Sequence, residues 1–109
     1  MAERVLEQCR LFNDGVRTGD WDGYLARFGD NATLSIAGDP ASPYVGREAI
    51  TAAYTAAPPD DTLSVTSVES AGDEDVAKVA WSQGGGGTLR VRWSAGRIAE
   101  LTAEFDAPA

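Results

Sequence analysis

Apolar residues recur with a helical period at the start of the chain. Four of them are spaced by four, three and four residues within the segment 3–18: Val5, Cys9, Phe12 and Val16. This spacing places one apolar face along an α-helix. Gly19 suits the C-cap of that helix, because glycine adopts the left-handed backbone conformation at little cost.

Two more helices are predicted in the first half of the chain. Asp20 is a natural N-cap for a short helix that ends near Gly29. A third helix spans residues 47–57, and the two prolines that follow end it. Its inner face should carry Ala49, Ile50, Ala53, Tyr54 and Ala57.

Alternation of apolar and polar residues predicts strands elsewhere. The predicted strands cover residues 32–37, 62–70, 76–83, 88–94 and 98–105. The segment 71–75, which contains Asp73-Glu74-Asp75, predicts a charged hairpin turn. The glycine run 84–87 joins two strands and has neither the following helix nor the lysine of a phosphate-binding loop, so it predicts a flexible hairpin loop.

The alternation also sorts the last three strands into two faces. The apolar face carries Val79, Trp81, Leu89, Val91, Trp93, Ala99, Leu101, Ala103 and Phe105. The polar face carries Lys78, Arg90, Arg92, Glu100, Thr102 and Glu104. One apolar face is typical of an α+β domain whose helices cover that side of an antiparallel sheet. Val68 and Ile98 are out of phase with their strands, and they are candidates for an interface with a second copy.

Length and charge narrow the class of protein. A chain of 109 residues predicts a single domain, 1–109. Its net charge of −8 repels phosphate backbones and anionic lipid, so we expect no nucleic-acid partner and no membrane partner. The N-terminal residues lack the apolar stretch of a signal peptide, and no run approaches the ~20 apolar residues of a membrane span, so a cytoplasmic location is expected.

The chain contains no histidine and one cysteine, Cys9. Ser-His-Asp and Cys-His catalytic relays are therefore excluded, and so are zinc sites of the usual His/Cys kind. Proton transfer near neutral pH would need a carboxylate, lysine or tyrosine with a shifted pKa. We expect no metal ion and no cofactor.

Three motifs resemble the nuclear-transport-factor-2-like superfamily, also called SnoaL-like. Residues 19–23, Gly-Asp-Trp-Asp-Gly, resemble the G-D-x-D-x turn between its first two helices. Residues 28–33, Phe-Gly-Asp-Asn-Ala-Thr, resemble its F-x-x-D/N-A-T entry to the first strand. Residues 46–50, Gly-Arg-Glu-Ala-Ile, resemble the start of its third helix. The motifs follow the family's order over about half of the chain.

The resemblance implies a cystatin-like cone, in which N-terminal helices pack on a curved antiparallel sheet around a cavity. It also implies a homodimer, which we expect to form through the sheet. Positions can be compared with ketosteroid isomerases, whose mechanism needs a base carboxylate and two oxyanion donors. The family's tyrosine falls on Phe12, its base on Ile36 and its second acid near Leu89. All three residues are apolar, which argues that this mechanism is absent.

Histidine-dependent cyclases and dehydratases of the superfamily are excluded by composition. Limonene-type epoxide hydrolases use an Asp-Arg-Asp set inside the cavity. Arg90 and Arg92 alternate away from the inferred inner face, which argues against that chemistry.

The predicted site is an apolar pocket for a small hydrophobic molecule. Tyrosine and tryptophan are favoured in such a wall, because each joins an apolar body to a polar tip. No catalytic residue is assigned. The residues predicted to contact the ligand are Phe12, Tyr24, Ile36, Tyr44, Tyr54, Trp81, Leu89, Trp93 and Phe105.

Three functions stay open at this point. Binding without catalysis requires a cavity into which no carboxylate points, and the alternation places no acid on the inner face. A small-molecule isomerase, lyase or hydrolase would use Tyr54, Tyr44 or a rim carboxylate such as Asp106, with a buried acid near a tyrosine. A dimeric structural module would have a filled pocket.

Overall fold

Helices cover one face of a single curved sheet. The computed structural model describes residues 2–106. In chain order its elements are α1 (Ala2–Thr18), α2 (Asp22–Leu25), β1 (Phe28–Ile36), β2 (Tyr44–Val45), α3 (Arg47–Ala56), β3 (Leu63–Ala71), β4 (Glu74–Trp81), β5 (Gly86–Ser94) and β6 (Arg97–Phe105). The strand order is β2-β1-β6-β5-β4-β3, and β1 runs parallel to β6 while the other neighbours are antiparallel.

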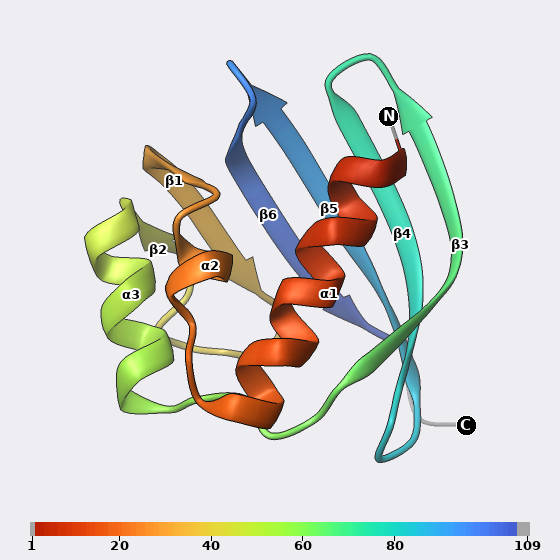
Figure 1. Ribbon diagram of the computed structural model, residues 1–109, viewed down its shortest axis with the longest axis horizontal. Helices are drawn as coiled ribbons and strands as arrows, with labels where there is room; N and C mark the ends of the chain where they lie inside the picture. The colour runs from red at the N-terminus through yellow and green to blue at the C-terminus, as the bar shows by residue number, and fades with distance from the viewer. Residues whose placement is uncertain (1, 107–109) are drawn as a thin grey trace.

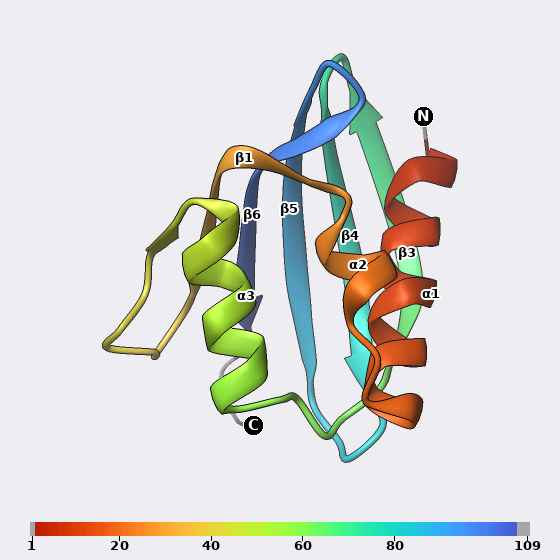
Figure 2. The same ribbon diagram turned by 60° about the vertical axis from the view of Figure 1, so that its left-hand side comes forward.

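The two long helices lie over different halves of the sheet. In Figure 1 and Figure 2, α1 lies along β3 and β4, while α3 lies beside β1. The predicted α+β cone, with N-terminal helices packed on a curved sheet, is confirmed. None of the helices between residues 2 and 106 is long and apolar enough to span a membrane.

The first helix ends where the sequence predicts. Gly19 has a φ of 79°, and its N–H donates to the Gly15 carbonyl oxygen at 2.8 Å. This left-handed residue lets the chain turn back toward the sheet. The apolar face of α1 is directed inward, since Val5 and Cys9 are buried and Phe12 packs against the same core.

The second helix is shorter than predicted. It ends at Leu25, and Trp21 rather than Asp20 occupies the N-cap. Asp20 instead accepts a hydrogen bond from the Asp22 N–H at 3.0 Å. Phe28 then opens β1 four residues earlier than predicted, because it pairs with Ile98 of β6 and is fully buried. Pairing with a distant strand overrides the helical pattern.

A β-bulge in β6 changes the phase of its alternation. Arg92 pairs with Glu100, but the next residue, Trp93, pairs with Ile98, which leaves Ala99 between the two pairs. An extra residue of this kind turns the following side chains to the opposite face. Ile98 is therefore directed into the core and is fully buried, while Ala99, predicted to face inward, is half-buried.

A second irregularity in β3 acts in the same way. The pairing with β4 shifts between Val65 and Ser67, and Val68 packs against the core cluster. The prediction that Ile98 marks an interface with another copy is wrong, because Ile98 is fully buried in the core. For Val68, which is half-buried, it stays a prediction. The homodimer through the sheet stays a prediction.

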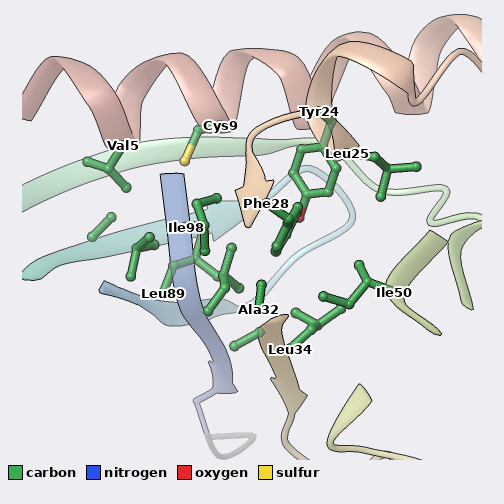
Figure 3. Packing of buried hydrophobic residues seen from close by; sticks show 14 of the residues in the cluster. Val5, Cys9, Tyr24, Leu25, Phe28, Ala32, Leu34, Ile50, Leu89 and Ile98 are labelled. Atoms are coloured by element: carbon green, nitrogen blue, oxygen red, sulfur yellow. The ribbon is translucent and has the colours of Figure 1, made fainter. Parts of the chain in front are cut away.

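The core lies between the helices and the covered face of the sheet. Figure 3 shows Val5 and Cys9 pointing from α1 toward the strands, and Tyr24 lying beside Phe28. Phe28 and Val5 are fully buried. Burial of such apolar surface is the main source of folding free energy in a domain of this size.

Four aromatic rings join the three helices. They belong to Phe12, Trp21, Tyr24 and Tyr54, and their centroids lie 5.0 to 5.8 Å apart in contacting pairs. Trp21 reaches this cluster by lying directly over Gly15 of α1. A Cβ atom at position 15 would lie 2.4 Å from Trp21 Cε3. The glycine that weakens the helical pattern is therefore required for packing.

We predict that Gly15→Ala lowers the free energy of unfolding by about 1–2 kcal/mol, because the cost of overpacking exceeds the gain in helix propensity. Urea denaturation followed by circular dichroism measures the change. Gly23→Ala is the matched control, since a Cβ there meets only Leu11 Cδ2 at 3.4 Å. A Gly15→Ala protein as stable as the wild type would contradict the role given to Trp21.

Candidate functional site

A cavity of about 430 Å³ lies between the helices and the covered face of the sheet. All three helices and every strand except β2 contribute to its walls. Alternate residues of two neighbouring strands form the floor: Leu89, Val91, Leu101 and Ala103. Because side chains two apart in a strand share one face, the alternation of β5 and β6 produces an apolar surface directly.

The mouth of the cavity lies at one end of the sheet. Exposed residues on its lining, Asp60 and Gly84, belong to the α3–β3 segment and the β4–β5 loop. Figure 1 shows these two loops at the same end of the molecule, opposite the β3–β4 hairpin. The carboxylate of Asp61, also on the lining, accepts hydrogen bonds from the Ser82 hydroxyl and from the Gln83 N–H, so it links the two loops.

The glycine run at this end is only partly a loop. Gly86 and Gly87 belong to β5, so the prediction of a flexible loop over 84–87 is wrong for these two residues. A Cβ on Gly87 would lie 2.5 Å from the Glu104 carbonyl oxygen and 3.2 Å from Trp81 Nε1. Glycine thus allows the Trp81 ring to lie on the sheet, where it packs 5.7 Å from the Phe105 ring and closes part of the cavity.

Two tyrosine hydroxyl groups form a pair on the cavity wall. Tyr24 Oη and Tyr54 Oη are 2.8 Å apart, and both side chains are buried. Burial raises the pKa of Tyr54 to about 12. The pKa of Tyr24 is also raised well above its usual value, first by burial and then by Tyr54. Both phenols are therefore neutral at physiological pH.

Gln8 is a polar residue that the helical pattern did not single out. It lies on the cavity lining from α1, and its side chain is 3% exposed. Gln8 Nε2 donates to the Tyr24 carbonyl oxygen at 3.2 Å, which ties α1 to α2. Among residues 2–106, no donor reaches Gln8 Oε1. Its position between Val5 and Cys9, on the apolar face, was the available signal.

The thiol of Cys9 also lies on this wall. Burial raises its pKa to about 11, so the thiol is protonated and behaves as a small apolar group. Within the described residues, no group of three or more Cys, Asp or Glu side chains is placed to hold a metal ion.

Most of the residues predicted to contact a ligand line this cavity. They are Phe12, Tyr24, Ile36, Tyr54, Trp81, Leu89 and Phe105. Tyr44 and Trp93 do not line it, so their predicted place in the wall is wrong. The hydroxyl of Tyr44, the first residue of β2, donates to Asp39 Oδ2 in the preceding loop at 2.6 Å. Trp93 lies at the opposite end of the sheet, where its indole N–H donates to Asp75 at 2.9 Å.

The prediction that Asp75 lies in a charged hairpin turn is wrong. Asp75 belongs to β4 rather than to a turn, and its side chain is fully buried on the helix-covered face. The expectation that no acid lies on the inner face is therefore wrong for Asp75, although Asp75 does not line the cavity. Extending the alternation of Ala77 and Val79 backward by two residues would have placed it inward.

Several groups stabilise the charge on Asp75. Arg4 Nε donates to Asp75 Oδ2 at 2.7 Å, and the Trp93 indole adds a second donor. The guanidinium groups of Arg4 and Arg27 each lie 5.4 Å from the centre of the Trp93 ring. Burial by itself would raise the pKa of Asp75, but the hydrogen bonds from Arg4, Ser70 and Trp93 outweigh it and lower that pKa. Asp75 is therefore a fixed anion.

We predict that Asp75→Asn lowers the free energy of unfolding by about 2–3 kcal/mol at neutral pH, because it removes hydrogen bonds to a charged group. The folded pKa of Asp75 lies below its ordinary value of 3.8. Its contribution is thus fully present above pH 3.8 and is lost as the pH falls through the lower folded pKa. The difference between variant and wild type should narrow over that acidic range.

Denaturation with urea at a series of pH values measures this difference. Glu104→Gln is the control, because it breaks an exposed ion pair in which Arg90 Nε lies 3.0 Å from Glu104 Oε1. Exposed pairs contribute little, so Glu104→Gln should change stability only slightly. A constant difference between Asp75→Asn and wild type at every pH would rule out the charged state assigned to Asp75.

The fold and the cavity define a small α+β cone with an internal pocket. The family model described as "SnoaL-like domain" matches residues 9–101. The chain therefore belongs to the SnoaL-like family. No curated protein matches the chain.

Solved structures share the fold at low identity. A SnoaL-like protein of unknown function from Burkholderia thailandensis E264 is 17% identical, with a TM-score of 0.78 over 98% of each chain. A candidate ketosteroid isomerase from Kribbella flavida DSM 17836 is 16% identical, with a TM-score of 0.76 over 98% of this chain and 81% of its own. A protein of unknown function with a cystatin-like fold from Methylobium petroleophilum PM1 is 18% identical, with a TM-score of 0.73 over 98% of this chain and 78% of its own.

Proposed function

We propose that this SnoaL-like domain binds a small, mostly apolar molecule in its cavity and does not transform it chemically. One observation carries the proposal: apart from Gln8, the wall around the Tyr24–Tyr54 pair is apolar, and the carboxylates on the lining, Asp60 and Asp61, come from the segment at the mouth. A pocket of a few hundred Å³, mostly apolar with a few polar groups, is the usual form of a small-ligand site.

The positions that matter in ketosteroid isomerases support binding without that catalysis. Phe12, Ile36 and Leu89, which the sequence comparison aligns with the catalytic positions of ketosteroid isomerases, all line the cavity. None of the three can donate or accept a hydrogen bond. The likeness to the candidate isomerase from Kribbella flavida concerns the fold, and these three residues give no support for carrying its activity over.

An enzyme with an unfamiliar active site is less well supported. It would need a carboxylate within hydrogen-bond reach of a cavity tyrosine. The buried acid, Asp75, lies at the other end of the sheet, where it forms an ion pair with Arg4. Asp106 is exposed and does not line the cavity, and Tyr44 is occupied by Asp39.

A purely structural role with a filled pocket is also less well supported. A cavity of about 430 Å³ is far larger than the space that one water molecule occupies, about 30 Å³. Protein interiors are otherwise close-packed, with few spaces larger than a water molecule.

We predict that cymene and naphthalene raise the melting temperature of the wild-type protein. A ligand at ten times its Kd adds about 1.4 kcal/mol, which corresponds to roughly 5–10 °C for a domain of this length. Ala103→Phe should abolish the shift, because Ala103 is on the cavity floor and the added ring fills the space.

Ala80→Phe is the matched control, since Ala80 is exposed on β4. It should leave the shift unchanged. Equal shifts in wild type and Ala103→Phe would locate binding outside the cavity, and no shift with any apolar compound would refute the proposed function.

A further inference from the structure

We propose that the ligand is a neutral apolar molecule carrying a hydroxyl group, and that Gln8 selects it by accepting a hydrogen bond from that hydroxyl. This inference rests on the proposed function, since it names the ligand class for the same cavity. It follows from the hydrogen-bonding capacity that the wall leaves unused and from the charges that surround it.

The Gln8 amide leaves one acceptor unused. Its Nε2 donates to the carbonyl oxygen of Tyr24 at 3.2 Å, and only the nitrogen of the amide can do this, so the orientation of the group is fixed. Oε1 is then the free atom, and within residues 2–106 it meets no donor. A buried carbonyl oxygen without a donor is unfavourable. A ligand that brings a donor removes this cost.

The tyrosine pair leaves one donor unused. One hydroxyl donates to the other across 2.8 Å, and the accepting hydroxyl keeps its own hydrogen. Among residues 2–106, no second partner of either hydroxyl meets hydrogen-bond geometry. Gln8 is hydrogen-bonded to the main chain of Tyr24, and Gln8, Tyr24 and Tyr54 all line the cavity. Gln8 and the pair therefore act on the same region of the cavity.

An alcohol or phenol fits the unused acceptor of Gln8 and the unused donor of the tyrosine pair at once, and the unpartnered Trp81 indole N–H adds a second donor to the same wall. The ligand O–H can donate to Gln8 Oε1, and its oxygen can accept from the free tyrosine hydrogen. An ether or a ketone can only accept, so it would leave Gln8 Oε1 without a partner.

The charges around the cavity favour a neutral ligand over an anionic one. No Lys or Arg is present among its lining residues in the described chain. Asp60 and Asp61 lie on the lining near the mouth, and the net charge is −8. The raised pKa values of Tyr54 and Cys9 show that burial at this wall disfavours negative charge. A carboxylate such as that of a fatty acid would therefore bind poorly.

A matched series of four probes tests the proposal in the wild-type protein. Thymol carries the hydroxyl, thymol methyl ether replaces its hydrogen with a methyl group, cymene lacks the oxygen, and cuminate carries a carboxylate on a similar ring. Isothermal titration at neutral pH gives each Kd. We expect thymol to bind at least about tenfold more tightly than its methyl ether, and cuminate to bind most weakly.

Two variants assign the preference to Gln8. Gln8→Met keeps the length of the side chain and removes the acceptor. The Kd values of thymol and thymol methyl ether should then differ by no more than about twofold. Leu89→Met changes the floor of the same cavity without touching the hydrogen bonds, so it should keep the tenfold preference. Circular dichroism checks that both proteins fold, and the wild-type series alone remains decisive if Gln8→Met does not.

The outcomes separate this inference from the proposed function. If thymol and its methyl ether bind equally, or if cuminate binds best, the inference is wrong while binding in the cavity stands. If the preference survives in Gln8→Met, Gln8 is not the selecting residue. If none of the four probes binds the wild-type protein, the proposed function fails and the inference fails with it.

Discussion

The carboxylate of Asp75 lies inside the fold as a charge, and Arg4 is the group that makes this tolerable. Arg4 belongs to the first turn of α1, whereas Asp75 lies in β4, 71 residues further along the chain. The contact therefore fixes the N-terminal end of α1 against the sheet. Replacing a buried ion pair with apolar residues often stabilises a protein, so such a pair adds little net stability. The Arg4–Asp75 pair instead fixes where α1 lies on the sheet. A helix held by a directional contact cannot slide along an apolar sheet.

The other end of α1 is held by a second polar contact. Asn13 Nδ2 donates to the Leu63 carbonyl oxygen at 2.8 Å, and Asn13 Oδ1 accepts from the Leu63 N–H at 2.9 Å. The side chain of Asn13 thus pairs with the first residue of β3 as a neighbouring strand would. With both ends held, the middle of α1 spans the sheet without collapsing onto it. The cavity lies beneath that middle part, where Gln8 and Phe12 line its wall. Apart from Asp60 and Asp61 near the mouth, the residues that line the cavity are uncharged.

Periodicity predicted the elements well because each covers one face of the core. It failed where a contact distant in sequence decides the outcome. The bulge that turns Ile98 inward depends on the pairing of β6 with β5, which no local pattern encodes. Asp75 reads as part of a turn because its partner, Arg4, is far away in the chain. Gln8 was not predicted for a different reason: hydrophobic periodicity identifies apolar positions, so it does not identify a polar residue on an apolar face. Alternation predicted most of the apolar residues of the cavity wall. The contacts of its polar groups could not be predicted, because they depend on how the helices pack on the sheet.

The cavity also has a consequence for stability. Apolar side chains that face a void lose dispersion contacts that a filled core would supply, so the domain without ligand is less stable than its fold allows. A ligand that binds only the folded state shifts the unfolding equilibrium by mass action. Gln8 Oε1 can add to the same effect, because a ligand hydroxyl supplies it with a donor in the folded state alone. Occupancy and folding are therefore coupled through the wall itself. The contacts of Asp75 and Asn13 lie outside the cavity, so they can hold α1 in place on the sheet whether or not a ligand is bound.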